Sequence, residues 1–244
     1  MSRVYSDTVL PEDSGVSQDL TLGTTGDTVQ VTSGASLNAN TIKDSGGNTI
    51  FTSDGSGNLS SVNAGMTGKP ALITTNTFTG GSSSSFTTGI DSTYKLYIFK
   101  AININPATDG ALFSFQANAS GQTGFNETMT TTFLSAQHSE GGADGALNYH
   151  SANDQSQGTS YQDITRMTGS DADQCCAGEL YLFDPSNTTY VTQWYAVFNN
   201  NYHGDYSMNV YTAGYFNLTA AITQLDFKMS SGNMDGTIKM YGLG

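Results

Sequence analysis

The chain has 244 residues, which is long enough for one large domain or for a smaller domain with an appendage. Charged residues make up only 12% of it and the net charge is −13, so the surface must consist mainly of uncharged polar residues. The eight Lys and Arg residues are spread singly, which disfavours nucleic acid and anionic membranes as partners, because both require clustered cations.

Targeting signals are missing from the sequence. No apolar run approaches the roughly 20 residues of a membrane-spanning helix, and the N-terminus lacks the apolar core of a signal peptide. We therefore expect synthesis in a cytoplasm without a cleaved signal and without membrane insertion. The two cysteines, Cys175 and Cys176, are adjacent, so a disulfide between them would be strained and we expect reduced thiols.

The N-terminal part divides into two segments. Residues 1–19 are polar, carry Pro11 and two neighbouring acids, and predict an irregular attachment segment. Residues 20–69 contain two loosely matching units of about 20 residues, in which Leu22 corresponds to Ile42. Each unit predicts short strands separated by glycine-containing turns.

These short strands carry too few apolar residues to form a core within one chain. Either the segment docks on the larger domain, or several copies wrap around one axis; a linker is the third reading. We favour a trimeric shaft, a homotrimer whose inward-facing residues are Val29, Val31, Ile42, Ile50, Phe51 and Leu59.

Residues 70–244 predict an antiparallel β-sandwich of jelly-roll type, because strands recur every 10 to 20 residues and no helical periodicity is present. The stretch Thr93–Ile104 has apolar residues on both faces, which is typical of a central strand. Alternation over Leu225–Met229 and again over Thr237–Leu243 predicts a closing hairpin. Its core residues are expected to be Leu225, Phe227, Met229, Ile238 and Met240.

A ligand site is predicted where aromatic residues surround the asparagine-rich loop 199–205. Aromatic rings stack on sugars, and amides and carboxylates bind their hydroxyls, so Tyr202, His203 and Asp205 are the candidate ligand-binding residues. The neighbouring Trp194 and Tyr211 are interpreted as packing residues, because alternate aromatics on a strand usually face the core.

The sequence favours no enzymatic activity. His138, Ser139 and Glu140 are consecutive, so on a strand they point to opposite faces and form no catalytic triad. No histidine lies at metal-ligand spacing from another His or Cys, and we expect no cofactor. Calcium is the one metal with candidate loops, Asp54–Asn58 and Asp171–Asp173, although turn formation explains both equally well.

Two stretches carry a resemblance to known proteins. The segment TLGTTGDTVQVTSGASLNANTIKDSGGNTIFTSDGSGNL is similar to shaft-like repeats in virion surface proteins of tailed bacteriophages, especially those of marine and cyanobacterial hosts. The ending ITQLDFKMSSGNMDGTIKMYGLG, preceded by STYKLYIFKAININPATDGALFSFQ, resembles a C-terminal β-sandwich of the same class.

The resemblance implies a trimeric virion component that is exposed to solvent and is joined to other virion proteins through its N-terminal segment. A tail fibre would place the sandwich at its distal end, where it contacts glycan on the host surface during adsorption. The alternative is a capsid decoration, cement or head-fibre protein that stabilises the particle without a ligand. No catalytic motif of the class maps onto these residues.

Overall fold

The computed structural model describes residues 39, 41–44, 46–56, 59–62, 70–142 and 144–244. The predictions for residues 1–19 and for Val29 and Val31 therefore lie outside the described residues. The chain separates into two units, residues 1–63 and 64–244, and each is described by itself below.

The first unit contains a small antiparallel sheet in the order β1-β2-β3. Its strands are β1 (Thr41–Lys43), β2 (Thr49–Ser53) and β3 (Leu59–Val62). Asp44 forms the turn after β1, because its carboxylate accepts hydrogen bonds from the backbone N–H groups of Gly46 and Asn48 at 2.9 and 2.8 Å.

The apolar residues of this small sheet remain poorly covered. Ile42, Ile50 and Phe51 are half-buried, while Leu59 is 59% exposed. Burial of so little apolar surface does not offset the chain entropy of folding. The trimer contacts proposed for these residues remain a prediction.

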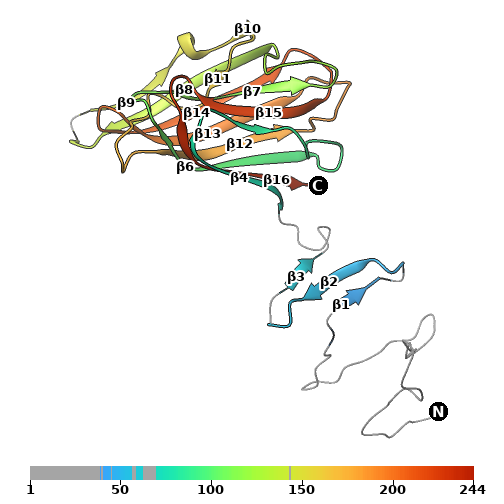
Figure 1. The fold of residues 1–244 in the computed structure, drawn as a ribbon. Helices are drawn as coiled ribbons and strands as arrows, with labels where there is room; N and C mark the ends of the chain where they lie inside the picture. Colours follow the sequence, from blue (N-terminus) through green and yellow to red (C-terminus); the bar gives the residue numbers. More distant parts are fainter. Residues whose placement is uncertain (1–38, 40, 45, 57–58, 63–69, 143) are drawn as a thin grey trace, which may run out of the picture. The chain divides into compact units, whose positions relative to one another are not determined.

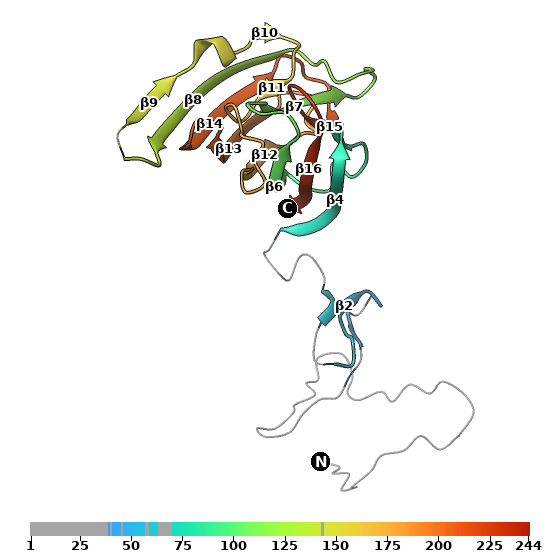
Figure 2. The ribbon, with the colours of Figure 1, turned by 60° about the vertical axis from the view of Figure 1, so that its left-hand side comes forward.

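The second unit is built on a nine-stranded antiparallel sheet, called here the large sheet, with the strand order β10-β8-β14-β13-β12-β6-β16-β4 and with β9 also paired to β8. Figure 2 shows it curving between β9 and β8 at one end and β4 at the other. Its strands are β4 (Ala71–Gly81), β6 (Leu96–Pro106), β8 (Met129–Ser139), β9 (Gly145–Tyr149), β10 (Ser156–Gly158), β12 (Cys176–Phe183), β13 (Gln193–Tyr202), β14 (Tyr206–Phe216) and β16 (Met234–Leu243).

A four-stranded antiparallel sheet, the small sheet of this unit, packs on the inner face of the large sheet (Figure 1). Its order is β11-β7-β15-β5, and its strands are β5 (Ser84–Phe86), β7 (Phe113–Ala119), β11 (Gln162–Asp163) and β15 (Ile222–Met229). The described residues include no α-helix, only a 3-10 turn, η1 (Ser151–Asn153). The predicted all-β, sandwich-like architecture is thus confirmed.

The predicted closing hairpin is wrong as a pairing. β15 pairs with β7 and β5 in the small sheet, whereas β16 pairs with β6 and β4 in the large sheet. The connection between them therefore crosses from one sheet to the other. The five residues predicted as core are all buried, because the two strands direct their apolar faces toward each other across the sandwich.

The core lies between the sheets and is rich in aromatic rings. β6 is a central strand, as predicted, since Tyr97, Ile98 and Phe99 are all buried and β12 and β16 flank it. A second, smaller cluster of Phe133, Met208 and Val210 lies on β8 and β14. Here η1 and the residues beside it provide the cover, since the ring of His150 packs edge-on against that of Phe133.

Candidate functional site

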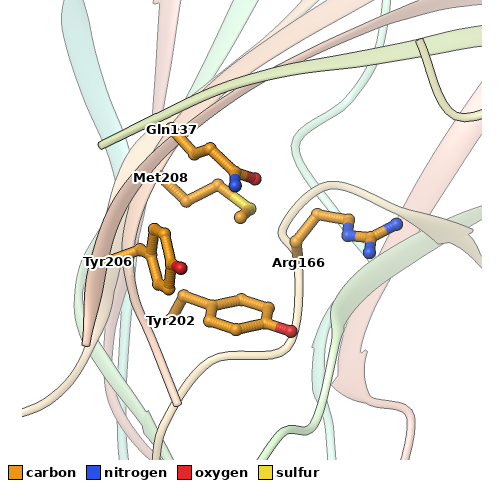
Figure 3. A pocket seen from close by; sticks show the side chains of 5 residues that line it. All are labelled: Gln137, Arg166, Tyr202, Tyr206 and Met208. Carbon is orange, nitrogen blue, oxygen red and sulfur yellow. The ribbon is translucent and has the colours of Figure 1, made fainter. Parts of the chain in front are cut away.

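A small polar pocket opens beside this second cluster, near the turn that joins β13 to β14. Its volume is about 150 Å³. Figure 3 shows its five lining side chains, Gln137, Arg166, Tyr202, Tyr206 and Met208. The side chain of Arg166 lies across the pocket from the other four, and its guanidinium points away from them.

The guanidinium of Arg166 is engaged by neutral groups rather than by a carboxylate. Its Nη1 donates to Nδ1 of His150 at 3.1 Å and to Oδ1 of Asn153 at 3.2 Å. Asn153 in turn donates to Asp163 at 2.9 Å, and burial raises the pKa of that carboxyl. We therefore interpret Arg166 mainly as a structural residue that joins the loop between β11 and β12 to His150 and Asn153. The pocket thus offers a ligand few free charged groups.

This arrangement fixes the protonation state of His150. Nδ1 must accept from Arg166, so Nε2 carries the proton and donates to Oγ of Ser135, 2.7 Å away. Burial and the positive charge of Arg166 lower the pKa of His150, while Asp154 opposes them. Protonation of His150 would remove the acceptor for Arg166.

We expect the folded state to lose stability as the pH falls below about 6.5, the ordinary pKa of histidine. Because the pKa of His150 is lower in the folded state, the unfolded chain binds the extra proton first, and the stabilising contribution is complete only above that pH. Urea titrations between pH 8 and pH 5 should show that the free energy of unfolding falls more steeply for the wild type than for His150→Gln. Equal slopes would contradict the assignment.

The three residues predicted to bind ligand lie together at the turn between β13 and β14, but only one of them lines the polar pocket. Tyr202 lines the polar pocket, but its hydroxyl reaches only the sulfur of Met167, at 3.5 Å. His203 packs on the ring of Tyr202, and its Nδ1 lies 3.7 Å from a carboxylate oxygen of Asp109. Asp205 lies in the turn with a positive φ of 64°. Neither His203 nor Asp205 is among the lining residues of the pocket.

The outer face of the large sheet carries exposed aromatic and aliphatic side chains. Tyr211 is 49% exposed, Tyr195 is 38% exposed and Leu134 is 37% exposed. The prediction that Tyr211 packs in the core is therefore wrong, whereas Trp194 is 2% exposed and does pack there. Successive residues of a strand point to opposite faces, and the small sheet covers only the inner one.

These side chains form a shallow depression on the outer face, which we call the outer slot. Its volume is about 210 Å³. The register places Ala213 of β14 directly between Tyr195 of β13 and Thr132 of β8. The lining residues are uncharged, and they are Thr132, Leu134, Tyr195, Ala196, Tyr211, Thr212 and Ala213.

An ordered aromatic stack adjoins the outer slot on one side. The rings of Tyr181 and Tyr195 lie 4.7 Å apart and are nearly parallel, at 13°. The hydroxyl of Tyr181 donates to Glu179, and this bond raises the pKa of Tyr181 to about 12. Glu179 also forms an ion pair of 2.7 Å with Lys100, so these two charges satisfy each other.

No protein-family model, curated protein or solved structure matches this chain.

The other features singled out in the sequence contribute little to either site. Within the described part of the chain, no three His, Cys, Asp or Glu side chains gather as a metal site would require, and no helix is long and apolar enough to cross a membrane. His138 hydrogen-bonds the backbone carbonyl of Ser139. Both cysteines are free thiols, and burial raises the pKa of each.

Sequence reasoning missed the outer slot. Its walls come from β8, β13 and β14, and the small size of Ala213 is what leaves room between them. The sequence carries no signal for it, because Tyr211 and Ala213 alternate with Val210 and Thr212 and either pair could have faced the core.

Proposed function

We propose that the protein is a structural component of a phage virion, a trimeric fibre exposed on the particle surface, whose jelly-roll-like sandwich binds glycan on the host cell. The observation that carries the proposal is the uncharged outer slot on the outer face of the large sheet, where Tyr195, Tyr211 and Leu134 are exposed. Exposed apolar surface of this kind marks binding sites in soluble proteins.

The chemistry of this face suits a sugar. Tyrosine rings stack on the apolar C–H faces of pyranoses, and their hydroxyls can exchange hydrogen bonds with sugar hydroxyls. Among the described residues, the hydroxyls of Tyr195 and Tyr211 have no hydrogen-bond partner. Polar groups are therefore free to select a ligand beside the apolar surface that would attract it.

The trimeric fibre is supported by the first unit and by the resemblance to phage virion proteins. The three short strands in the described part of this unit leave Leu59 exposed and Ile42 and Phe51 half-buried, which copies around a shared axis would cover. Three linked sandwiches would also raise the apparent affinity for a surface that displays many identical glycans.

A glycan array probed with the full chain tests the proposal. We expect binding to a restricted set of glycans at micromolar protein concentrations, and loss of that binding in the double variant Tyr195→Ala/Tyr211→Ala. Absence of binding at high micromolar concentrations would contradict glycan recognition and leave capsid decoration as the alternative. Copy number in the parent particle separates these two, since a tail fibre needs a few copies and a decoration protein needs hundreds.

A further inference from the structure

Because of the strand order, the stack of Tyr181 and Tyr195 is open at its Tyr195 end. β13 lies between β12 and β14, and Tyr195 is in register with Tyr181 on one side and with Ala213 on the other. Tyr181 covers one face of the Tyr195 ring at a centroid distance of 4.7 Å. The opposite face of Tyr195 is therefore directed toward β14 and lines the outer slot.

Ala213 occupies the position in register with Tyr195 on the next strand, where an aromatic residue would add a third ring to the stack. Neighbouring strands lie about 4.8 Å apart, a spacing close to that between stacked rings. A methyl group at this position leaves the space above it open, and the following residue in register, Thr132 of β8, forms the far wall. The slot is thus about one ring thick.

We propose that the outer slot binds a single uncharged pyranose ring, held over Ala213 as the third layer of the Tyr181–Tyr195 stack. This inference rests on the proposed glycan-binding function and specifies its ligand. The sugar places its C–H face on Tyr195 and its hydroxyls near Tyr211 and Thr132. The hydroxyls of both residues lack hydrogen-bond partners within the described part of the chain.

The charge of the ligand follows from the lining. The side chains around the slot are uncharged, so a carboxylate or sulfate on the sugar would lose hydration without gaining a partner. Lys100 and Glu179 lie on the same face, but they form an ion pair of 2.7 Å with each other and so do not serve as partners for a charged ligand. We therefore expect neutral hexoses to be preferred over hexuronic acids.

Filling the slot provides the test. Saturation-transfer NMR on the full chain, with the methyl glycosides of glucose, galactose, mannose and glucuronic acid as probes, should detect at least one neutral hexoside and give a weaker signal for the glucuronide. Ala213→Phe should reduce that binding at least tenfold. The matched control is Ala177→Phe, which adds the same ring at an exposed position of β12 outside the slot.

Two further variants keep the result interpretable. If melting shows that Ala213→Phe is unfolded, Ala213→Leu fills the slot with a smaller side chain and should show the same loss. Thr132→Val keeps the shape of the wall and removes its hydroxyl, and a several-fold loss is expected. If the array finds glycan ligands but no neutral hexoside binds, or if folded Ala213 variants bind as the wild type does, this inference is overturned while the proposed function stands. If no glycan binds at all, both fail.

Discussion

Replacing Phe227 by alanine should lower the free energy of unfolding by about 3 to 5 kcal/mol, the range for large aromatic residues in a core. Phe227 lies on the small sheet, and its ring packs against Phe86, Phe99, Phe113 and Phe115 at centroid distances of 5.6 to 6.1 Å. Because Phe99 belongs to the large sheet, this one side chain ties the two layers together. Urea denaturation monitored by tyrosine and tryptophan fluorescence measures the change.

The control for this prediction is Phe183→Ala. Phe183 is also on a strand, but it lies on the outer face and is 38% exposed. Its substitution removes less buried surface and leaves no cavity between the sheets, so we expect a loss of less than about 1.5 kcal/mol. Similar losses for the two variants would contradict the packing of the sheets described above.

Removing the aromatic walls of the outer slot should abolish most glycan binding. Stacking on Tyr195 contributes roughly 1 kcal/mol beyond the area buried, and a hydrogen bond from Tyr211 contributes about as much, so Tyr195→Ala and Tyr211→Ala should each weaken binding about tenfold. The double variant should lose on the order of 100-fold if the two effects add, although contacting residues often couple. Isothermal titration with a glycan selected from the array measures the change.

The matched control for these variants is Tyr190→Ala. Tyr190 is 72% exposed and lies in the loop between β12 and β13, outside the slot. Its substitution removes one surface tyrosine of the same chemistry and should leave affinity within about twofold. Equal losses for Tyr190 and Tyr211 would point to nonspecific adhesion of tyrosines instead of a defined site.

The strand pattern predicted the all-β fold because alternation shows which side chains face a core. It places Leu225, Phe227, Ile238 and Met240 inside, as the structure does. Alternation does not determine which strands become neighbours. The alternation in β15 and β16 is compatible with a hairpin and equally with two strands that belong to different sheets. The long-range pairing of β15 with β7 and of β16 with β6 determines which of the two forms.

The site was harder to predict for a related reason. On β14, residues 210 and 212 are apolar or small, as are residues 211 and 213, so the sequence does not show which face the other sheet covers. That depends on the extent of the small sheet, which is set by contacts far along the chain. The slot also requires that Thr132, Ala213 and Tyr195 come into register from three strands.

The most direct measurement for the central claim is an amide chemical-shift titration of the full chain with an array-selected glycan. We predict that the largest changes occur at Leu134, Tyr195 and Ala213 around the outer slot. Residues of the polar pocket on the inner side, such as Gln137 and Met208, should change little. Changes centred on the polar pocket, or spread evenly over the sandwich, would contradict the account.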